Sequence, residues 1–428
     1  MAGPGGAEQG GAAVRRLLIS LGLPTLGLAF GLSILTTYGP VVLLRVAHSP
    51  ARVGALIGGE GAFALAIPLV AGALSDRMSP TPLGRRLPFI IAGLPLVVTG
   101  LLLLPWASSY LVAGIAVLLF FVGYYLYYPP YRAMYADVLP RRLYARAQAS
   151  QAVLRGLGLG AALMTGGLFL GAWTPLPFVV AAGVMLATTF PLGRVARLQG
   201  TFTAGVVDAH PTSVRDLVFG NRAMMTFAAA NSMWEFSFAG LRTFIVLYVV
   251  SGLDRSPSVA SAVIAVVAAA YVAGAPVASR LVDRFGILPV MTWSAIVFGV
   301  GLCYGAIPTT LPPLLVVLPV VALAGAILLT LPPALAFTLA PHGSQGAAAG
   351  IIDVSRGVGV VLGPVAVGAA VSMMSSSLFS ATRGYAAMWP VIGLSVLLSV
   401  PLLRRLEPAL QSQGSEPTRS AEGLRAPV

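Results

Sequence analysis

Charged residues are scarce in this sequence. Asp, Glu, Lys and Arg together make up only 9% of the 428 residues, whereas typical soluble domains contain roughly 25%. The hydrophobic share is 57%, and the mean hydropathy is +0.90. A soluble core of this length does not need so much apolar surface. The composition therefore excludes a soluble globular protein and predicts a chain that crosses a membrane many times.

Cysteine and histidine are rarer still, with one and three copies. Cys303 has no partner for an intramolecular disulfide, and its apolar surroundings predict a packing residue. His48, His210 and His342 all fall in loops, so none is placed as a buried proton relay. The apolar stretches contain no metal-ligand cluster and no nucleophile–base motif. We therefore expect no metal, no cofactor and no enzymatic activity.

Lysine is absent, so all 26 basic residues are arginine, and the net charge is +13. The arginines are dispersed among apolar stretches, which argues against a nucleic-acid partner. With the N-terminus placed inside the cell, most arginines of loops and tails fall on the cytoplasmic side. Only Arg45, Arg52, Arg255 and Arg383 fall outside. This asymmetry follows the positive-inside rule and predicts a multi-pass protein of the cell membrane with both termini in the cytoplasm.

Twelve apolar stretches are long enough to cross a hydrocarbon core of roughly 30 Å as helices. They are residues 17–44, 53–74, 87–106, 109–138, 147–171, 175–193, 221–250, 259–280, 287–306, 312–340, 347–371 and 385–403. One long polar connection, residues 194–220, separates a bundle at 17–193 from a bundle at 221–403. The tails, 1–16 and 404–428, are expected to be disordered. The sequence thus predicts an all-α membrane protein with two six-helix bundles.

Three short motifs occur in the same order in both halves, at a nearly constant offset. The pairs are Asp76-Arg77 with Asp283-Arg284, Pro129-Pro130 with Pro332-Pro333, and Arg155-Gly156-x-Gly158 with Arg356-Gly357-x-Gly359. Such a repeat predicts two parallel, pseudo-symmetric bundles related by an axis along the membrane normal. The equivalent positions of Arg155 and Arg356 predict that they do the same structural or coupling work. Asp353, at i−3 from Arg356, is a possible partner within the same helix.

Acidic residues inside the spans are candidates for proton coupling, because a charge there costs at least about 2.5–3.5 kcal/mol. Glu60 lies about 12 Å into the second span, and no basic residue follows it at helical spacing in that span. A lone carboxylate in a low-dielectric site can exchange a proton; the alternative is a protonated Glu60 that bonds to a neighbouring helix. Asn231, Glu235 and Arg242 share one face of the seventh span. There Glu235 is the second proton candidate, Asn231 a candidate for substrate binding, and Arg242 is expected to extend towards the outer surface.

A row of tyrosines predicts a substrate-binding face on the fourth span. Tyr124, Tyr128, Tyr131 and Tyr135 recur at helical spacing, and Arg132 lies beside them. Aromatic rings that stack and hydroxyls that donate, next to a fixed cation, suit a polyhydroxylated or anionic solute. Arg132, Tyr124, Tyr128 and Tyr131 are therefore candidate substrate ligands. The alternative for the tyrosines is packing against neighbouring helices.

Charged residues at the cytoplasmic helix ends predict a gate that closes the inner side. These are Asp76, Arg77, Arg85, Arg86, Asp137, Asp283 and Arg284. An arginine of the loop between the second and third spans can pair with a carboxylate at a neighbouring helix end. We expect substitutions there to act by shifting a conformational equilibrium rather than by contact with substrate.

The motif Gly72-x-x-x-Asp76-Arg77 followed by Gly84-Arg85-Arg86 resembles the loop signature of the major facilitator superfamily. Its continuation, Leu87-Pro88-Phe89, and the run Pro130-Tyr131-Arg132-Ala133-x-x-x-Asp137 resemble the sucrose–proton symporter family and the related glycoside–pentoside–hexuronide cation symporters. This finer resemblance covers about the first third of the chain. It implies that Arg132 is needed for sugar transport, but it does not name the solute.

Three functions remain open from the sequence. The first is a proton-coupled importer of a small hydroxylated solute, sugar-like or glycoside-like. The second is an exporter of a drug or secondary metabolite that exchanges it for protons. The third is a membrane assembly or signalling factor built on the same fold. The expected partners are a small solute, protons and the lipid bilayer, and the expected state is a monomer.

Overall fold

The computed structural model describes residues 4–77, 86–139, 143–193, 221–340, 345–376, 378–408 and 410. Within these ranges all regular structure is helical, without a strand. The predicted linker, 194–220, and nearly all of the C-terminal tail lie outside the described residues. Residues 69–77 belong to a helix whose side chains are not described.

Each half contains six membrane-crossing segments, some of them built from two or three consecutive elements. The first half consists of α1 (Pro4–Ser33), η1 (Ile34–Tyr38), α2 (Gly39–Ala47), α3 (Pro50–Arg77), α4 (Leu87–Leu103), η2 (Leu104–Trp106), α5 (Tyr110–Val138), α6 (Tyr144–Ala172) and α7 (Leu176–Thr189). The second half consists of α10 (Arg222–Leu247), η4 (Tyr248–Gly252), α11 (Pro257–Phe285), α12 (Ile287–Tyr304), α13 (Leu311–Thr330), α14 (Pro332–Leu339), α15 (Gln345–Met373), η5 (Ser380–Thr382), η6 (Tyr385–Ala387) and α16 (Met388–Arg405).

The apolar lengths of these helices confirm the predicted twelve-helix architecture. Nine described helical segments are long and apolar enough to cross a membrane, and α7 and α11 contain shorter apolar stretches. α3, with 28 residues, completes the six segments of the first half. Ser109, Asn221 and Ser256 cap α5, α10 and α11 by accepting hydrogen bonds from backbone N–H groups of the first turn.

The N-terminal helix corrects one expectation. The sequence predicted a disordered tail up to residue 16, but α1 begins at Pro4. Proline is pre-organised for the first helical position, and residues 4–16 continue without a break into the apolar helix that follows, so the helix begins earlier than its hydropathy indicates despite four glycines in this stretch. The two proline pairs also behave differently: α5 is continuous through Pro129-Pro130, whereas the tenth segment breaks at Leu331, directly before Pro332.

The first segment of each half contains a short π-helical stretch. η1 interrupts the first segment between α1 and α2, and η4 ends the seventh after α10. A π-helical turn places one extra residue in the helix and often marks a functional position. Here it occurs in the two segments that are equivalent by the internal repeat.

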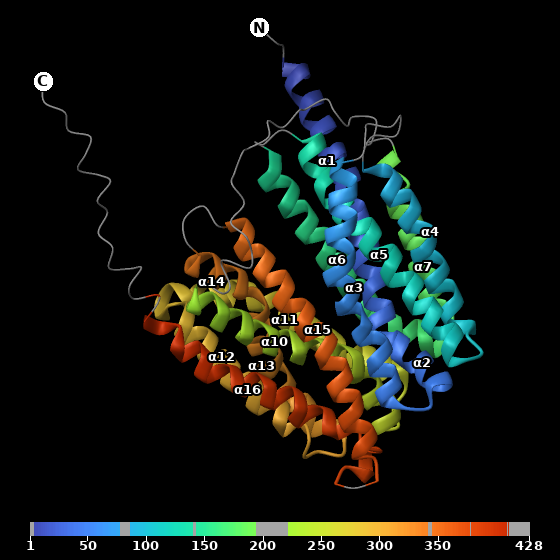
Figure 1. Cartoon of the computed structure of the whole chain (residues 1–428), viewed down its shortest axis with the longest axis vertical. Coiled ribbons are helices and arrows are strands. Elements are labelled where there is room, and N and C mark those ends of the chain that lie inside the picture. Colours follow the sequence, from blue (N-terminus) through green and yellow to red (C-terminus); the bar gives the residue numbers. More distant parts are fainter. Residues whose placement is uncertain are drawn as a thin grey trace, which may run out of the picture.

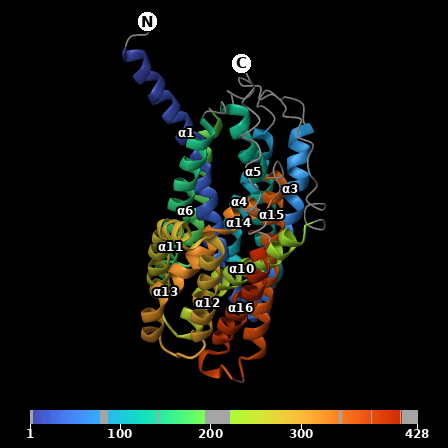
Figure 2. The ribbon, with the colours of Figure 1, turned by 90° about the vertical axis from the view of Figure 1, so that its left-hand side faces the viewer.

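The two halves lie side by side (Figures 1 and 2), and two helix pairs make the most extensive contacts between them. α15 packs against α3, and α11 packs against α6. Glycines at these contacts leave no room for a side chain: Gly368 faces the carbonyl of Pro50, and Gly167 faces the carbonyl of Pro257. Small residues let helix backbones approach closely inside a membrane. The two contacts are pseudo-symmetric, since both the glycines and the prolines are separated by nearly the repeat offset.

These contacts lie towards one end of the molecule, where α3 and α11 begin. Besides the glycines, Ser49 and Ser372 approach with their hydroxyl oxygens 3.4 Å apart. The hydroxyl of Tyr38 donates to the carbonyl of Leu163 at 2.5 Å and lies 2.8 Å from Oγ of Ser261, across the two halves. We call this end the closed end.

Candidate functional site

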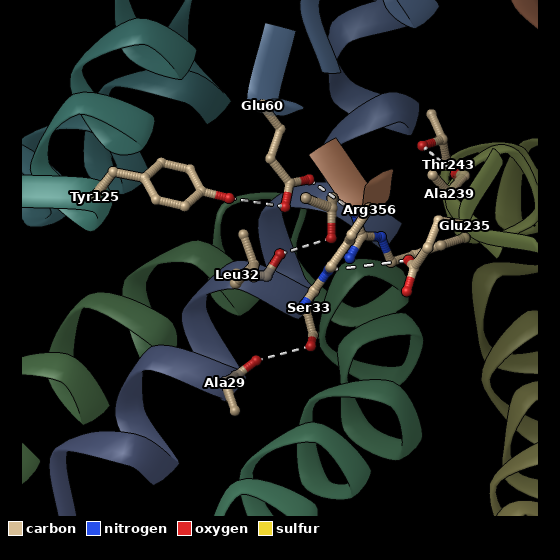
Figure 3. Close-up of polar contacts among 11 residues, drawn as sticks. Ala29, Leu32, Ser33, Glu60, Tyr125, Glu235, Ala239, Thr243 and Arg356 are labelled. Carbon is tan, nitrogen blue, oxygen red and sulfur yellow. Dashed lines mark hydrogen bonds and ion pairs between the residues drawn. The ribbon is translucent and has the colours of Figure 1, made fainter. Parts of the chain in front are cut away.

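An ion pair joins the two halves near the middle of the molecule. Glu60, on α3, is 2% exposed, and its Oε2 lies 2.7 Å from Nη2 of Arg242, on α10. The hydroxyl of Tyr125, on α5, donates to the other carboxylate oxygen at 3.4 Å (Figure 3). The Arg242 guanidinium replaces the water that an ionised carboxylate would otherwise need.

This pair corrects two interpretations of the sequence. Glu60 was expected to lack a cation, and Arg242 was expected to extend towards the outer surface. Each is instead the partner of the other. The expectation was wrong because helical spacing reveals partners within one helix, whereas this pair joins helices from different halves.

A second pair lies next to the first, within the second half. Nε of Arg356, on α15, is 3.9 Å from Oε2 of Glu235, on α10. Arg356 lies near both Glu60 and Glu235 in the close-up (Figure 3), and its ion pair is with Glu235. We call Glu60, Glu235, Arg242 and Arg356 the central charge cluster. The negative charges of its two carboxylates equal the positive charges of its two guanidinium groups.

The pairing of Arg356 replaces the one expected within its own helix. Asp353, three residues earlier, is exposed and forms no ion pair with Arg356 among the described contacts. Glu235 is available from the facing helix, α10, which packs closely against α15. The equivalent arginine of the first half, Arg155, has a different partner: its Nη2 donates to the hydroxyl of Tyr128 at 3.0 Å.

Aromatic rings connect the central charge cluster to a second group of polar residues on α5 and α6. Tyr124 meets Tyr125 edge to face at 5.1 Å between ring centroids and stacks on Tyr128 at 5.7 Å. Arg132 lies over the ring of Tyr128, with Cζ 5.6 Å from its centroid. We call Tyr124, Tyr128, Arg132 and Arg155 the arginine–tyrosine group. The structure thus places one of the predicted tyrosines, Tyr128, against Arg132, and a second, Tyr124, is stacked on Tyr128.

The other two tyrosines of the row are packed against α1. The hydroxyl of Tyr131 donates to the carbonyl of Leu21 at 2.5 Å and lies 2.7 Å from Oγ1 of Thr25. Tyr135 bonds to the same carbonyl at 2.6 Å. Tyr131 is fully buried, so in this conformation it has no surface for a solute. The predicted face is therefore divided between the site and the packing of α5.

Asn231 is also engaged in packing. Its Nδ2 donates to Oγ of Ser355 at 2.8 Å, and both residues are buried. The bond holds α10 to α15 one helical turn from Glu235. Asn231 therefore does not face a free surface here, and its amide positions the two helices that carry Glu235 and Arg356.

The predicted gating residues lie far along the helices from the closed end. Asp283 and Arg284 are exposed near the end of α11, where Arg284 lies over the ring of Phe285. Arg86 is buried at the start of α4. Asp76 and Arg77 end α3 and Asp137 lies near the end of α5, but their side chains, like the whole of Arg85, lie outside the described residues. Their role stays a prediction.

Tyr125 and Arg242 are the site residues that the sequence did not assign. Tyr125 is next to the tyrosine row but on a different face of α5, so its spacing gave no signal. Arg242 could have been proposed as a partner of an acid, because buried acids and arginines in membrane spans must pair with each other. Among the described residues, no group of three or more His, Cys, Asp or Glu residues lies close enough to hold a metal ion.

Comparison with known proteins extends these observations. A model of the Major Facilitator Superfamily matches residues 9–163 and 223–426. No curated protein sequence matches the chain. Among solved structures, the fold is similar to a bacterial homologue of the human lysosomal transporter Spinster in an inward-facing, unoccupied conformation. The TM-score is 0.78 at 14% identity, covering 93% of this chain and 98% of that one.

Two further solved structures show the same likeness. The nucleoside transporter NupG matches with a TM-score of 0.72 at 15% identity, covering 92% of this chain and 99% of its own. A bacterial homologue of the iron transporter ferroportin matches with a TM-score of 0.66 at 12% identity, covering 91% and 98%. At these identities the likeness concerns the fold alone.

Proposed function

Since the chain belongs to the major facilitator superfamily, we propose that it is a secondary transporter that moves a small hydroxylated solute together with protons, by alternating access between its two halves. Glu60 carries the proton. Tyr128 and Arg132 contact the solute, and the buried ring of Tyr124 supports that of Tyr128. The transporter works as a monomer in the cell membrane with both termini in the cytoplasm.

The ion pair between Glu60 and Arg242 is the observation that carries this proposal. It joins the two halves, and it exists only while Glu60 is ionised. Removing one partner of a buried pair costs about 3–5 kcal/mol, and the lower end applies because Arg242 is 26% exposed. A proton on Glu60 would weaken the contact between α3 and α10 and favour separation of the halves at the closed end. A shift from 1:99 to 99:1 between two states needs about 5.5 kcal/mol, so this pair supplies about half of it.

The second acid, Glu235, can compensate positive charge of the cluster when Glu60 is protonated. When Glu60 is protonated, Arg242 and Arg356 are left with one carboxylate between them. Arg356 lies 3.9 Å from Glu235 and near Glu60 (Figure 3), so Glu235 offsets part of the uncompensated charge. Glu235 is thus a second possible proton carrier, and its substitution separates the two roles.

The aromatic surface supports a hydroxylated, cyclic solute. The half-buried ring of Tyr128 offers an aromatic surface on which the apolar side of a sugar ring can lie, and Arg132 and the Tyr128 hydroxyl offer hydrogen bonds. The resemblance of the first third of the sequence to sugar–proton symporters supports the same solute class.

Transport by purified protein in liposomes tests the proposal. A set of labelled sugars and glycosides is offered with a proton gradient directed along and against solute movement. We expect saturable accumulation driven by the gradient. The variant Glu60→Gln should lose this accumulation but keep exchange of labelled for unlabelled solute, because exchange needs no net proton movement.

Asp254→Asn is the matched control, since this acid forms an exposed ion pair with Arg383 away from the site. It should transport like the wild type. Accumulation by Glu60→Gln equal to that of the wild type would contradict the role of Glu60. Solute loss driven by the opposite gradient, together with resistance to a drug on expression, would assign export instead.

A further inference from the structure

The four arginines of the central charge cluster and the arginine–tyrosine group fall into two kinds. Arg242 and Arg356 each pair with a carboxylate of the central charge cluster. Arg132 and Arg155 contact only an aromatic residue, Tyr128, and no acid of the described part of the chain lies within ion-pair distance of either. An arginine keeps its charge under all physiological conditions. Two cations thus lie beside a balanced cluster without a counter-charge from the residues whose side chains the structure describes.

These two cations converge on one side chain from different helices. Arg132 comes from α5 and lies over the Tyr128 ring, whereas Arg155 comes from α6 and donates to its hydroxyl. Like charges that converge on one tyrosine repel each other, and both side chains are exposed rather than held by packing. Each guanidinium has five N–H donors, of which the described contacts use one at Arg155 and none at Arg132. The remaining donors are free for an acceptor with several oxygens.

We propose that the solute carries an anionic group, a carboxylate or a phosphate, which Arg132 and Arg155 bind together beside Tyr128. An oxyanion accepts paired hydrogen bonds from guanidinium groups and removes their repulsion. The rest of the solute lies on the half-buried ring of Tyr128, which Tyr124 supports from behind. The class is therefore a cyclic, hydroxylated acid, such as a uronic acid or a sugar phosphate. This inference rests on the proposed transport function for its physiological meaning, but the binding itself is tested separately.

Thermal unfolding of the purified full-length protein with matched pairs of probes tests this inference. Glucuronate is compared with glucose, and glucose 6-phosphate is compared with glucose, over a range of concentrations. We expect at least one charged probe to raise the unfolding temperature, with neutral glucose giving a smaller shift or none. Added salt should weaken the effect, since it screens charge. The two charged arms distinguish a carboxylate from a phosphate.

Variants connect the effect to the two arginines. Arg155→Gln and Arg132→Gln should each weaken binding of the charged probe roughly 10- to 100-fold, the range for a lost hydrogen bond to a charged group. Arg155→Lys keeps the charge and should retain part of the affinity. Arg383→Gln is the control, because Arg383 pairs with Asp254 in an exposed loop. Its affinity should equal that of the wild type.

The outcomes separate this inference from the transport proposal. Equal stabilisation by charged and neutral probes, or none by either charged probe, would overturn the inference. So would unchanged affinity in both glutamine variants that unfold at the wild-type temperature without a probe. Arginine-dependent binding of a charged probe without any proton-driven transport would leave the anion site in place and overturn the transport proposal instead.

Discussion

Glu60 and Arg242 form the contact on which the proposed coupling depends. The carboxylate is 2% exposed and has two partners, Arg242 at 2.7 Å and Tyr125 at 3.4 Å. The shorter contact is charge-assisted and the longer one is at the limit of a hydrogen bond, so Arg242 contributes most of the stabilisation. In the proposed mechanism, protonation of this carboxylate removes the ion pair, so one side chain would link protonation to the contact between the halves.

A double-mutant cycle on this pair gives the first prediction at the residue scale. Glu60→Gln and Arg242→Gln should each lower the free energy of unfolding, because each leaves one charged or polar partner unsatisfied. The double variant should lose less than the sum of the two, with an interaction energy of about 0.5–3 kcal/mol. Thermal or denaturant unfolding of the purified protein measures it. Additive losses would show that the pair is not formed in solution.

Residue roles were the part of the site that the sequence predicted least well. Glu60 and Arg132 were selected because an ionisable residue inside a span is costly. The structure places Glu60 in an ion pair and Arg132 over the ring of Tyr128, a neighbour on its own helix that the tyrosine spacing indicated. The partner of Glu60 was not predictable, because Arg242 comes from another helix. Asp353 was expected to pair with Arg356 from its spacing alone, but the neighbouring helix supplies Glu235 instead.

Helix boundaries, in contrast, follow closely from the sequence. The fourth span was predicted at 109–138, and α5 occupies Tyr110–Val138. Long apolar runs bounded by polar loops have few alternatives in a membrane, since every backbone group must be bonded within its helix. The π-helical stretches and the break at Leu331 were not predictable, because they depend on how neighbouring helices pack.

At the scale of helices, the glycines of the closed end predict that an added methyl group there separates the two halves. A Cβ at Gly167 would meet the carbonyl of Pro257, whereas a Cβ at Gly183, on α7, would meet nothing within 4 Å. Gly167→Ala should therefore open the closed end, although alanine is the better helix former. The readout is maleimide labelling of a cysteine at Ser372 in protein that carries Cys303→Ala.

Labelling at Ser372 should be several-fold faster in Gly167→Ala than in the parent protein. Gly183→Ala should label at the parent rate and be at least as stable. Equal labelling in both glycine variants would mean that the contact between α6 and α11 does not hold the closed end together.

At the scale of the whole molecule, some contacts between the halves follow the internal repeat and one does not. The contacts of Gly167 with Pro257 and of Gly368 with Pro50 are pseudo-symmetric, which suits two halves that rock against each other. The ion pair is not symmetric: at the repeat offset of 207 residues, Glu60 corresponds to Val267 and Arg242 to Leu35. Closure is thus a property of the shared fold, whereas the charged pair is specific to one side of the interface. We infer that the asymmetric pair makes closure sensitive to protons.

The distance between the halves at the closed end, measured at acidic and alkaline pH, tests the coupling most directly. Spin labels are placed at Ser49 and Ser372, whose hydroxyl oxygens are 3.4 Å apart, in protein that carries Cys303→Ala. We predict a short distance at alkaline pH, a growing long-distance population at acidic pH, and a long distance at both pH values in Glu60→Gln. The same pH-dependent change in Glu60→Gln as in the parent protein would contradict the account.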